Sequence, residues 1–495
     1  MSNITAAPPD REASPGHPDE RTFMGQPGVL ANLFNVELWE RFSFYGMQVV
    51  LMLYLYFETS EGGLGLGEGT AAGIIGAYGA SVYLFTIIGG LVADRLIGPE
   101  RTLFFSAILI MCGHLALALL PGLLGVGIGL VLVAIGSGGL KANATTLVGE
   151  LYSKEDDRRD AGFSIFYMGV NIGGLLGPLL TGWARQEWGF HLAFGLAAVG
   201  MLIGLLQYWR GRGRLPESVH HVPNPLPASQ RGRWVLAALA ALALIAALIG
   251  FRVVTLENVD TTLTVFVVIA SVVYFAVMIT SKQVTEVERS RVWAFVPLFL
   301  ASAAFWSLFQ QQFTVLAVYS DKRLNRDLFG WEVPIEWVNS INPVFIILFA
   351  PLFAALWTKL ARRQPPTPVK FALGVILCGI AFLLFIPLAG SGANSVPVVA
   401  IVGILFVMTM GELMLSPVGS SVTTKLAPEA FQTQMVALYF LSVALGTAMS
   451  GLLAQFYSAE GERMYFGVLG AVALGIGALL LLVAKPVLSL MRGVR

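Results

Sequence analysis

Three ionisable residues, Glu37, Glu40 and Arg41, lie close together inside the long apolar run of residues 29–57. Side chains three and four positions apart share one face of a helix, so these residues and Tyr45 would form one polar stripe. A charge at membrane depth costs at least ~2.5–3.5 kcal/mol and usually has a function. Because Arg41 can neutralise only one of the two glutamates, the other is free to exchange a proton. We therefore predict a proton-coupling site that faces a cavity, in preference to a purely structural ion pair.

Other apolar segments also carry charge at membrane depth. Lys141 follows a glycine-rich stretch and lies about ten residues from the nearest loop, too deep for its amine to reach water easily. Glu412 lies in a later segment, with Ser416 one helical turn further on. Cations on one wall of a cavity and an anion on the other would suit a zwitterion. Its carboxylate would face Arg41 and Lys141, and its amine would face Glu412.

Neutral polar residues accompany these charges. Asn171, Gln310 and Asn342 lie within apolar segments, and Pro343 is expected to break its helix so that backbone groups can line a cavity. Tyr83 is as readily explained by packing as by a cavity. These residues extend the predicted site over both halves of the chain.

The composition places the chain among integral membrane proteins. Hydrophobic residues make up 56% of the chain, charged residues 12%, and the mean hydropathy is +0.74, whereas soluble domains carry about 25% charged residues. The net charge of +1 and the lack of a basic patch give no reason to expect a nucleic-acid partner. The two cysteines, Cys112 and Cys378, are best explained as buried apolar residues. We expect lipid contact and no metal or other cofactor.

Fourteen apolar segments are long enough to cross a bilayer, which takes about 20 residues. We place them at residues 28–57, 69–97, 101–121, 124–150, 158–184, 190–210, 233–251, 261–281, 290–320, 334–361, 369–390, 396–425, 431–457 and 463–490. Lys and Arg are concentrated in the loops on the side of the N-terminus, so both termini are expected in the cytoplasm.

The spacing of the segments predicts an all-α integral membrane protein built from two six-helix bundles with two extra helices between them. The expected parts are a disordered cytoplasmic tail (1–27), an N-terminal bundle (28–210), a linker with two accessory helices (211–289) and a C-terminal bundle (290–495). Two such bundles around a central cavity are typical of the major facilitator fold. The stretch from Gly89 to Gly98, with Asp94 and Arg95, is similar to the loop after the second helix in that superfamily.

Three further motifs resemble those of the bacterial proton-dependent oligopeptide transporter family. They are Glu37-x-x-Glu40-Arg41-Phe42, Phe166-Tyr167-x-x-x-Asn171-x-Gly173 and Gly411-Glu412-Leu413-x-x-Ser416-Pro417-x-Gly419. All three occur in order on suitably placed segments, and the resemblance runs from about residue 28 to residue 490. The two additional helices between the bundles are also typical of bacterial members.

The resemblance implies a proton-coupled symporter that imports di- and tripeptides by alternating access, in the bacterial inner membrane and as a monomer. Protons are the coupling ion. It implies that Glu37 and Glu40 serve proton coupling, together with Arg41 and Lys141. The last two also lie near the peptide carboxylate, while Glu412 meets the peptide amine. The remaining substrate-binding residues that we expect are Tyr45, Tyr83, Asn171, Gln310, Asn342, Ser416 and Tyr439.

The sequence departs from the family pattern at several positions. Phe44 replaces the first Tyr after the helix 1 motif, Ala142 replaces a Pro, and Tyr439 stands where the family has a pocket Trp. Gln310 stands where the family commonly has a Glu that pairs with the helix 1 arginine. A glutamine does not titrate, so more of the proton coupling should fall on Glu37 and Glu40.

Two alternatives remain open from the sequence. The same fold could carry another small zwitterion or anion, such as nitrate or a drug, but nitrate-type relatives add a pocket histidine, and none of the five histidines is an obvious candidate. An integral membrane enzyme is the other alternative. No nucleophile–His–acid set and no metal-spaced His/Cys cluster lies at membrane depth, so we do not expect an enzyme.

Overall fold

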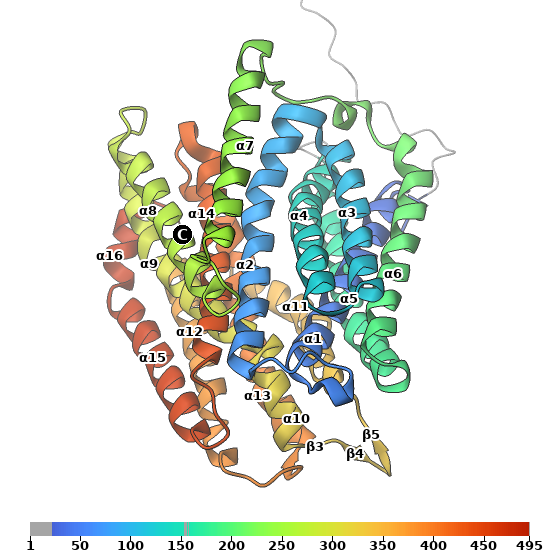
Figure 1. The fold of residues 1–495 in the computed structure, drawn as a ribbon. Coiled ribbons are helices and arrows are strands. Elements are labelled where there is room, and N and C mark those ends of the chain that lie inside the picture. The colour runs from blue at the N-terminus through green and yellow to red at the C-terminus, as the bar shows by residue number, and fades with distance from the viewer. Residues whose placement is uncertain (1–21, 153–155, 157, 495) are drawn as a thin grey trace, which may run out of the picture.

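The computed structural model describes residues 22–494 except 153–155 and 157, and it is almost entirely helical (Figure 1). The helices of the first half are α1 (Leu30–Tyr56), α2 (Glu68–Val92), α3 (Pro99–Leu119), α4 (Gly122–Gly149), α5 (Arg159–Trp188) and α6 (Phe190–Gly211). Two helices follow, α7 (Ala228–Gly250) and α8 (Val259–Thr280). The second half contains α9 (Glu286–Phe309), α10 (Val315–Arg323), α11 (Ile341–Leu360), α12 (Thr367–Leu383), α13 (Val398–Leu426), α14 (Gln432–Ala454), α15 (Glu462–Leu482) and the short α16 (Ala484–Leu490).

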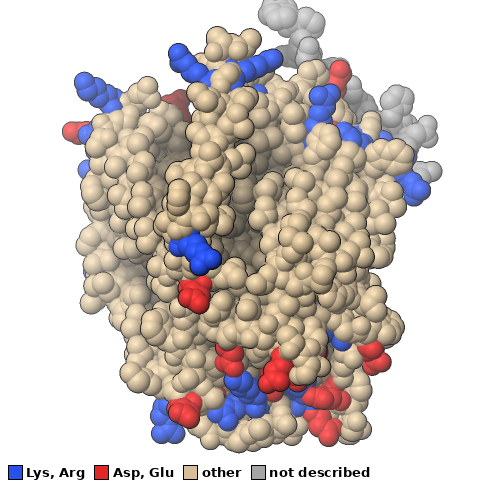
Figure 2. Space-filling model, viewed as in Figure 1, with Lys and Arg blue, Asp and Glu red and all other residues tan. Residues whose placement is uncertain are grey.

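The helices account for the fourteen expected spans. Among the described residues, thirteen helices or joined helices are long and apolar enough to cross a membrane. The fourteenth span is α1, whose 27 residues exceed the ~20 that a crossing needs, although it carries three charges. Charged side chains gather at the two ends of the molecule, with a broad, mostly uncharged band between them (Figure 2).

The helix bundle has two opposite sides, at which the helices begin and end. We call the side where α1 begins and α2 ends the α1-start side, and the side where α1 ends and α2 begins the α1-end side. The strands in the described part of the chain are two-residue pieces near these surfaces: β1 (Thr22–Phe23) with β2 (Gln26–Pro27), β3 (Leu324–Asn325) with β6 (Val396–Pro397), and β4 (Asp327–Leu328) with β5 (Trp331–Glu332).

The end of the predicted tail is folded. Residues 22–27 form the β1–β2 hairpin, and the Tyr152 hydroxyl donates a hydrogen bond of 3.1 Å to Oε1 of Gln26, which is buried. The expectation of a disordered tail through residue 27 is therefore wrong for residues 22–27. Residues 1–21 lie outside the described residues.

The two halves touch along α2 and α14. A Cβ atom added at Gly76 would lie 2.8 Å from the Cα of Gly451, so the two helix backbones are in direct contact there. Small residues permit such close approach between membrane helices. The helix α8 packs on both α2 and α14, and Figure 1 shows it beside α14. Its buried Asp260 accepts a hydrogen bond of 2.5 Å from Gln455, whereas α7 has no buried residue.

Polar contacts join the halves on the α1-end side. The Tyr56 hydroxyl donates to Asp321 at 2.5 Å, and Lys322 of the same helix, α10, pairs with Glu68 of α2. Nearby, Arg185 of α5 pairs with Glu336 of a short 3-10 helix, Ile335–Ser340, that precedes α11. These contacts hold the α1-end side together.

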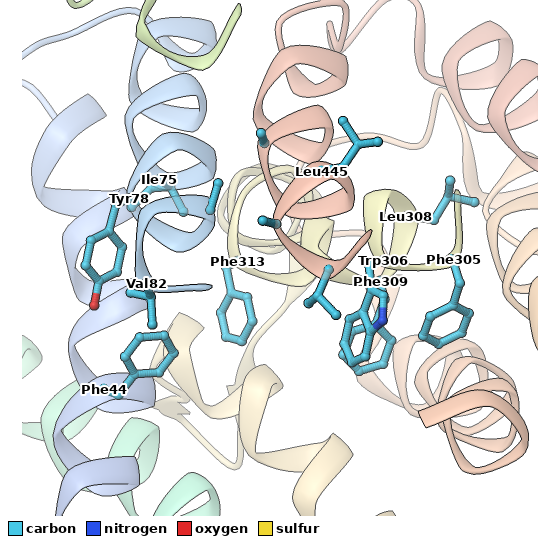
Figure 3. Close-up of a cluster of buried hydrophobic side chains, with 14 of the residues drawn as sticks. Phe44, Ile75, Tyr78, Val82, Phe305, Trp306, Leu308, Phe309, Phe313 and Leu445 are labelled. Atoms are coloured by element: carbon cyan, nitrogen blue, oxygen red, sulfur yellow. The ribbon is translucent and has the colours of Figure 1, made fainter. Parts of the chain in front are cut away.

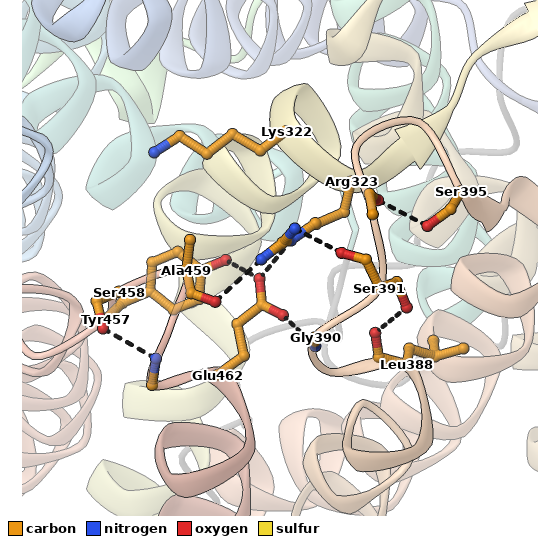
Figure 4. A network of polar contacts seen from close by, with 12 residues as sticks. Lys322, Arg323, Leu388, Gly390, Ser391, Ser395, Tyr457, Ser458, Ala459 and Glu462 are labelled. Atoms are coloured by element: carbon orange, nitrogen blue, oxygen red, sulfur yellow. Dashed lines mark hydrogen bonds and ion pairs between the residues drawn. The ribbon is translucent and has the colours of Figure 1, made fainter.

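The residue after Lys322 anchors α10 to its own half. The Arg323 guanidinium lies 2.9 Å from Glu462 and donates at 2.9 Å to the carbonyl of Ala459, and Glu462 also accepts from the Gly390 amide at 3.1 Å (Figure 4). These contacts hold α10 in a fixed position, so Asp321 and Lys322 are oriented towards their partners in the first half.

Candidate functional site

A cavity of about 280 Å³ lies between the two halves, near the lower end of the range of small-molecule sites. Its walls come from α1, α2, α4 and α5 on one side, and from α9, α11, α13 and the segments between α9 and α11 on the other. Ten of the predicted site residues line it: Glu37, Arg41, Tyr45, Tyr83, Lys141, Asn171, Gln310, Asn342, Glu412 and Ser416.

The charged stripe of α1 splits into two environments. Nε of Arg41 lies 3.0 Å from Oε1 of Glu37 and 2.7 Å from Oε2 of Glu40. Glu37 lines the cavity, whereas Glu40 is fully buried and is not among the lining residues. Breaking a buried ion pair leaves an uncompensated charge, so each glutamate has a direct influence on where the Arg41 side chain rests.

Close packing against α5 fixes the height and rotation of α1. A Cβ atom at Gly173 would lie 2.2 Å from the Leu38 carbonyl oxygen, and one at Gly177 would lie 2.5 Å from that of Phe42. Only glycine leaves room for the α1 backbone at these positions. The two glycines therefore hold the face of α1 that carries Arg41 towards the cavity.

Lys141 supplies the second cation of the first half. Its amine lies 4.5 Å from the centroid of the Tyr83 ring, within the range of a cation–π contact. This contact gives Tyr83 a definite role in the cavity wall, where the sequence left packing as an equal explanation.

Glu412 faces the cavity from the second half, on α13. Nδ2 of Asn342 donates to Oε2 of Glu412 at 3.0 Å and lies 2.9 Å from Oγ1 of Thr409. Asn342 occupies the first turn of α11, directly after the 3-10 helix, so the expected break lies just before it. The Glu412 carboxylate is thus oriented by the Asn342 amide, and neither of these two contacts involves a cation.

Tyr439 lies behind the cavity wall. It is 8% exposed, and its hydroxyl donates a hydrogen bond of 3.3 Å to the Ser416 carbonyl. Tyr439 is not among the lining residues. Its predicted direct role in substrate binding has no support from this placement, and its contact instead fixes α13 next to Ser416.

Gln310 lies where the helix of the ninth span is interrupted. The α-helix α9 ends at Phe309, and Gln310–Phe313 form one 3-10 turn before α10 begins. Nε2 of Gln310 donates to Oγ1 of Thr447 at 3.3 Å. Arg41, in contrast, pairs with the two glutamates of its own helix, as the absence of a glutamate at position 310 predicts.

Several residues that line the cavity were not predicted from the sequence. Gln48 continues the polar stripe of α1, three residues after Tyr45 and seven after Arg41, so its spacing could have identified it. Tyr167 belongs to the motif that contains Asn171, whose amide donates to the Tyr167 carbonyl at 2.9 Å. The others that were missed include Thr145, Gln312, Asn339 and a set of aromatic residues, Phe44, Phe166, Trp306, Phe309 and Phe313.

Aromatic rings cover the part of the cavity between the halves. The rings of Tyr45 and Phe313 stack with centroids 5.9 Å apart and an interplanar angle of 18°. Figure 3 shows Phe44 beside α1, Trp306 and Phe309 on the side of the second half, and Phe313 between them. Aromatic residues in apolar segments are usually core residues, so nothing in the sequence indicates that these four line the cavity.

The site holds no arrangement typical of a metal centre. Among the described residues, no group of three or more His, Cys, Asp or Glu side chains could hold a metal ion. The ionisable groups that line the cavity are instead the cations Arg41 and Lys141, with Glu37 beside Arg41, on one wall and the single carboxylate of Glu412 on the other.

Comparison with known proteins agrees with this geometry. The family model described as "POT family" matches residues 100–470. A di-/tripeptide transporter of Lactococcus lactis subsp. cremoris is 42% identical over 96% of this chain and 99% of the relative. An uncharacterised transporter of Bacillus subtilis, YclF, is 44% identical over 96% of this chain and 97% of its own.

Solved structures give the same result. A crystal structure of a peptide transporter POT in complex with sulfate has a TM-score of 0.91 and 44% identity, covering 96% of this chain and 98% of the other. A POT family transporter in complex with 5-aminolevulinic acid has a TM-score of 0.89 and 36% identity, covering 94% and 98%. The predicted major facilitator fold, with two six-helix bundles and two extra helices, is confirmed. The chain is a multi-pass membrane transport protein and not an enzyme, and it belongs to the POT family of peptide transporters.

Proposed function

We propose that the protein is a proton-coupled symporter that imports di- and tripeptides. The observation that carries the proposal is the opposition of charge across one cavity, with Arg41 and Lys141 on the first half and Glu412 on the second. A short peptide is a zwitterion with charges at its two ends. The names of the Lactococcus relatives support the same substrate class.

The peptide lies across the cavity between the two halves. Its carboxylate faces Arg41 and Lys141, and its amine faces Glu412, while Asn171 and Asn342 bind its backbone groups. Main-chain recognition at both ends leaves the side chains against the aromatic wall, which tolerates different sizes. Specificity for length then follows from the distance between the two charged walls.

We infer a state that is closed on the α1-end side and faces the cytoplasm. The polar contacts between the halves lie on the α1-end side. In α5 the cavity residues from Phe166 to Pro178 precede Arg185, which belongs to those polar contacts. Lys and Arg predominate at one end of the molecule, whereas both signs mix at the other (Figure 2). By the positive-inside rule the α1-start side is cytoplasmic, with both termini, and the membrane is the bacterial inner membrane.

Proton coupling resides in the α1 cluster. When Glu37 and Glu40 are ionised, they hold Arg41 through its Nε. When one of them takes up a proton, Arg41 loses part of this attraction and turns to the substrate carboxylate. Proton binding and peptide binding thereby support each other, which is the requirement for symport. We expect the monomer to suffice, because this cavity is built from one chain.

Uptake into proteoliposomes tests the proposal. With an inward proton gradient, vesicles that hold purified protein should accumulate labelled dialanine above the outside concentration, and a proton ionophore should abolish the accumulation. Folded protein that accumulates none of a panel of di- and tripeptides would contradict it.

A second candidate substrate class has one observation in its favour. The structurally similar transporter with 5-aminolevulinic acid bound indicates that this fold holds a zwitterion that is not a peptide. Any molecule with an amine and a carboxylate at a suitable separation could place its carboxylate near Arg41 and Lys141 and its amine near Glu412. Competition of 5-aminolevulinic acid with labelled dialanine would separate a broad zwitterion carrier from a strict peptide carrier.

A further inference from the structure

The carboxylate of Glu40 is enclosed among other polar groups that lack hydrogen-bond partners. Glu40 is 0% exposed, and neither of its oxygens has a hydrogen-bond partner, although Oε2 lies 2.7 Å from Nε of Arg41. Buried polar groups without partners are rare in proteins and call for an explanation. Glu40 does not line the cavity, so a bound peptide has no direct access to it.

Ser137 of α4 is the hydroxyl beside this carboxylate. Its side chain faces Glu40, yet Oγ does not meet hydrogen-bond geometry with any group, and the residue is 0% exposed. The glycines on either side of Ser137 allow α4 to pack closely against α2 and α3. A Cβ atom at Gly138 would lie 2.5 Å from the backbone of Phe85 in α2, and one at Gly136 would lie 2.7 Å from the backbone of Ser106 in α3. The Ser137 hydroxyl is therefore held in place by a rigid helix.

A hydroxyl has the chemistry that a proton-carrying carboxyl needs. It donates one hydrogen bond and accepts others by rotating its O–H. Facing ionised Glu40, Ser137 would donate to the carboxylate, and facing protonated Glu40 it would accept from the acid proton. A small adjustment of the Ser137 or Glu40 side chain, together with rotation of the O–H, thus gives each protonation state a partner, with no movement of the backbone.

The charged groups that face Glu40 cannot replace this hydroxyl. Arg41 only donates, and Lys141 donates as an ammonium. The buried Tyr78 of α2 also has a hydroxyl without a partner, and Figure 3 shows it beside Phe44 of α1. The ionisable groups that act electrostatically on Glu40, or on which Glu40 acts, are Glu37, Arg41, Tyr45, Tyr78, Tyr83 and Lys141.

We propose that Ser137 is a positioning residue for proton coupling, which holds the proton of the enclosed Glu40 through a hydroxyl that donates in one state and accepts in the other. This inference rests on the proposed proton-coupled function. It assigns different tasks to the two glutamates: Glu37 meets the cavity, whereas Glu40 and Ser137 form an enclosed proton site behind it.

The test compares Ser137→Ala and Ser137→Cys with the wild type. Cysteine fills nearly the same space but is a weak hydrogen-bond donor, so it separates hydrogen bonding from packing. Two measurements are made in proteoliposomes: the pH profile of proton-driven dialanine uptake, and counterflow, the exchange of labelled for unlabelled dialanine without a proton gradient. Ser271→Ala, which removes a buried hydroxyl that bonds only to the Val267 carbonyl in α8, is the matched control.

We expect both Ser137 variants to move the pH profile of uptake to higher pH by roughly 0.5–1 unit, because a hydrogen bond to the ionised carboxylate is stronger than one to the neutral acid, and both are lost. A shift of this size corresponds to ~0.7–1.4 kcal/mol. Counterflow should stay within about twofold of the wild type, since the cavity is unchanged. The Ser271→Ala control should match the wild type in both measurements.

Three results would overturn the inference. One is an unchanged pH profile in Ser137→Ala, and another is a Ser137→Cys variant that matches the wild type while Ser137→Ala does not, which would show a packing role. The third is an equal loss of uptake and counterflow in the two variants. If the wild type itself fails to accumulate dialanine, the proposed function fails instead, so the two failures are distinguishable.

Discussion

Gln310 donates a hydrogen bond to Thr447 at 3.3 Å, within the second half, although it lines the same cavity as Arg41. A glutamine has no charge with which to compete for the guanidinium. Arg41 is consequently held by Glu37 and Glu40, both on its own helix. The ion pairs that the structure shows for Arg41 therefore lie within the first half.

The first prediction concerns the two glutamates of α1. Glu37→Gln and Glu40→Gln each remove a partner of Arg41 and a proton acceptor, so proton-driven dialanine uptake should fall at least about tenfold. Counterflow should persist, because the cavity and its opposed charges remain. Uptake and counterflow are measured in parallel in proteoliposomes. A similar loss in both assays would show that the substitutions destabilise the folded protein and do not act on proton coupling alone.

The second prediction restores a carboxylate at position 310. Gln310→Glu adds a group that must itself be protonated before the cavity regains its present charge, so the pH optimum of uptake should move to lower pH. Gln310→Ala is the matched control, since it also breaks the bond to Thr447 without adding charge, and it should keep the wild-type optimum. Identical profiles for the two variants would exclude an influence of this position on coupling.

The third prediction concerns the cation of α4. Lys141→Ala should impair proton-driven accumulation, because the carboxylate end of the peptide loses a charge-assisted hydrogen bond worth ~1.5–3 kcal/mol, or about ten- to a hundredfold in affinity. The loss should be seen for dialanine and be much smaller for its C-terminal amide. Competition assays with both peptides decide it, and an equal loss for both would place Lys141 away from the carboxylate.

The fourth prediction concerns the opposite wall. Glu412→Gln keeps a partner for Asn342 but removes the negative charge, so the concentration of dialanine needed for half-maximal competition should rise about tenfold or more. An N-acetylated peptide, which lacks the amine, should be affected little by the same substitution. If both ligands weaken equally, Glu412 serves the shape of the cavity and not the amine.

The fifth prediction tests the contacts on the α1-end side. Glu336→Ala frees Arg185, and Glu68→Ala frees Lys322, so the double variant should open this side more often. A cysteine introduced by Gln48→Cys, in a background where Cys112 and Cys378 are replaced by Ala, should then react faster with a membrane-impermeant maleimide from outside. An unchanged labelling rate would show that these ion pairs do not hold the closed side together.

Much of the fold followed from the sequence because the bilayer restricts it. Spanning segments must be helical and about 20 residues long, so the fourteen spans could be placed from apolar runs alone. The α1 cluster was equally visible, since charge in an apolar run is rare. Interruptions were harder: the 3-10 turn that begins at Gln310 carries no proline or glycine, and only the packed structure shows it.

The site was predicted where charge or motif marked it and missed where packing decided. Phe313 and Trp306 differ in no way from core residues in the sequence, and only their position between the halves brings them to the cavity. Tyr439 shows the opposite error. Its place in a familiar pattern suggested a pocket residue, but its hydroxyl is directed to the Ser416 carbonyl behind the wall.

The most direct test of the account is proton movement driven by peptide. Vesicles that contain the protein and an enclosed pH-sensitive dye, held at a negative internal potential, receive dialanine from outside. The account predicts that the vesicle interior acidifies when dialanine is added to the wild type, and that it does not when dialanine is added to the Glu37→Gln or Glu40→Gln variant. Dialanine uptake by the wild type without acidification, or full acidification in both variants, would contradict coupling through the glutamates of α1.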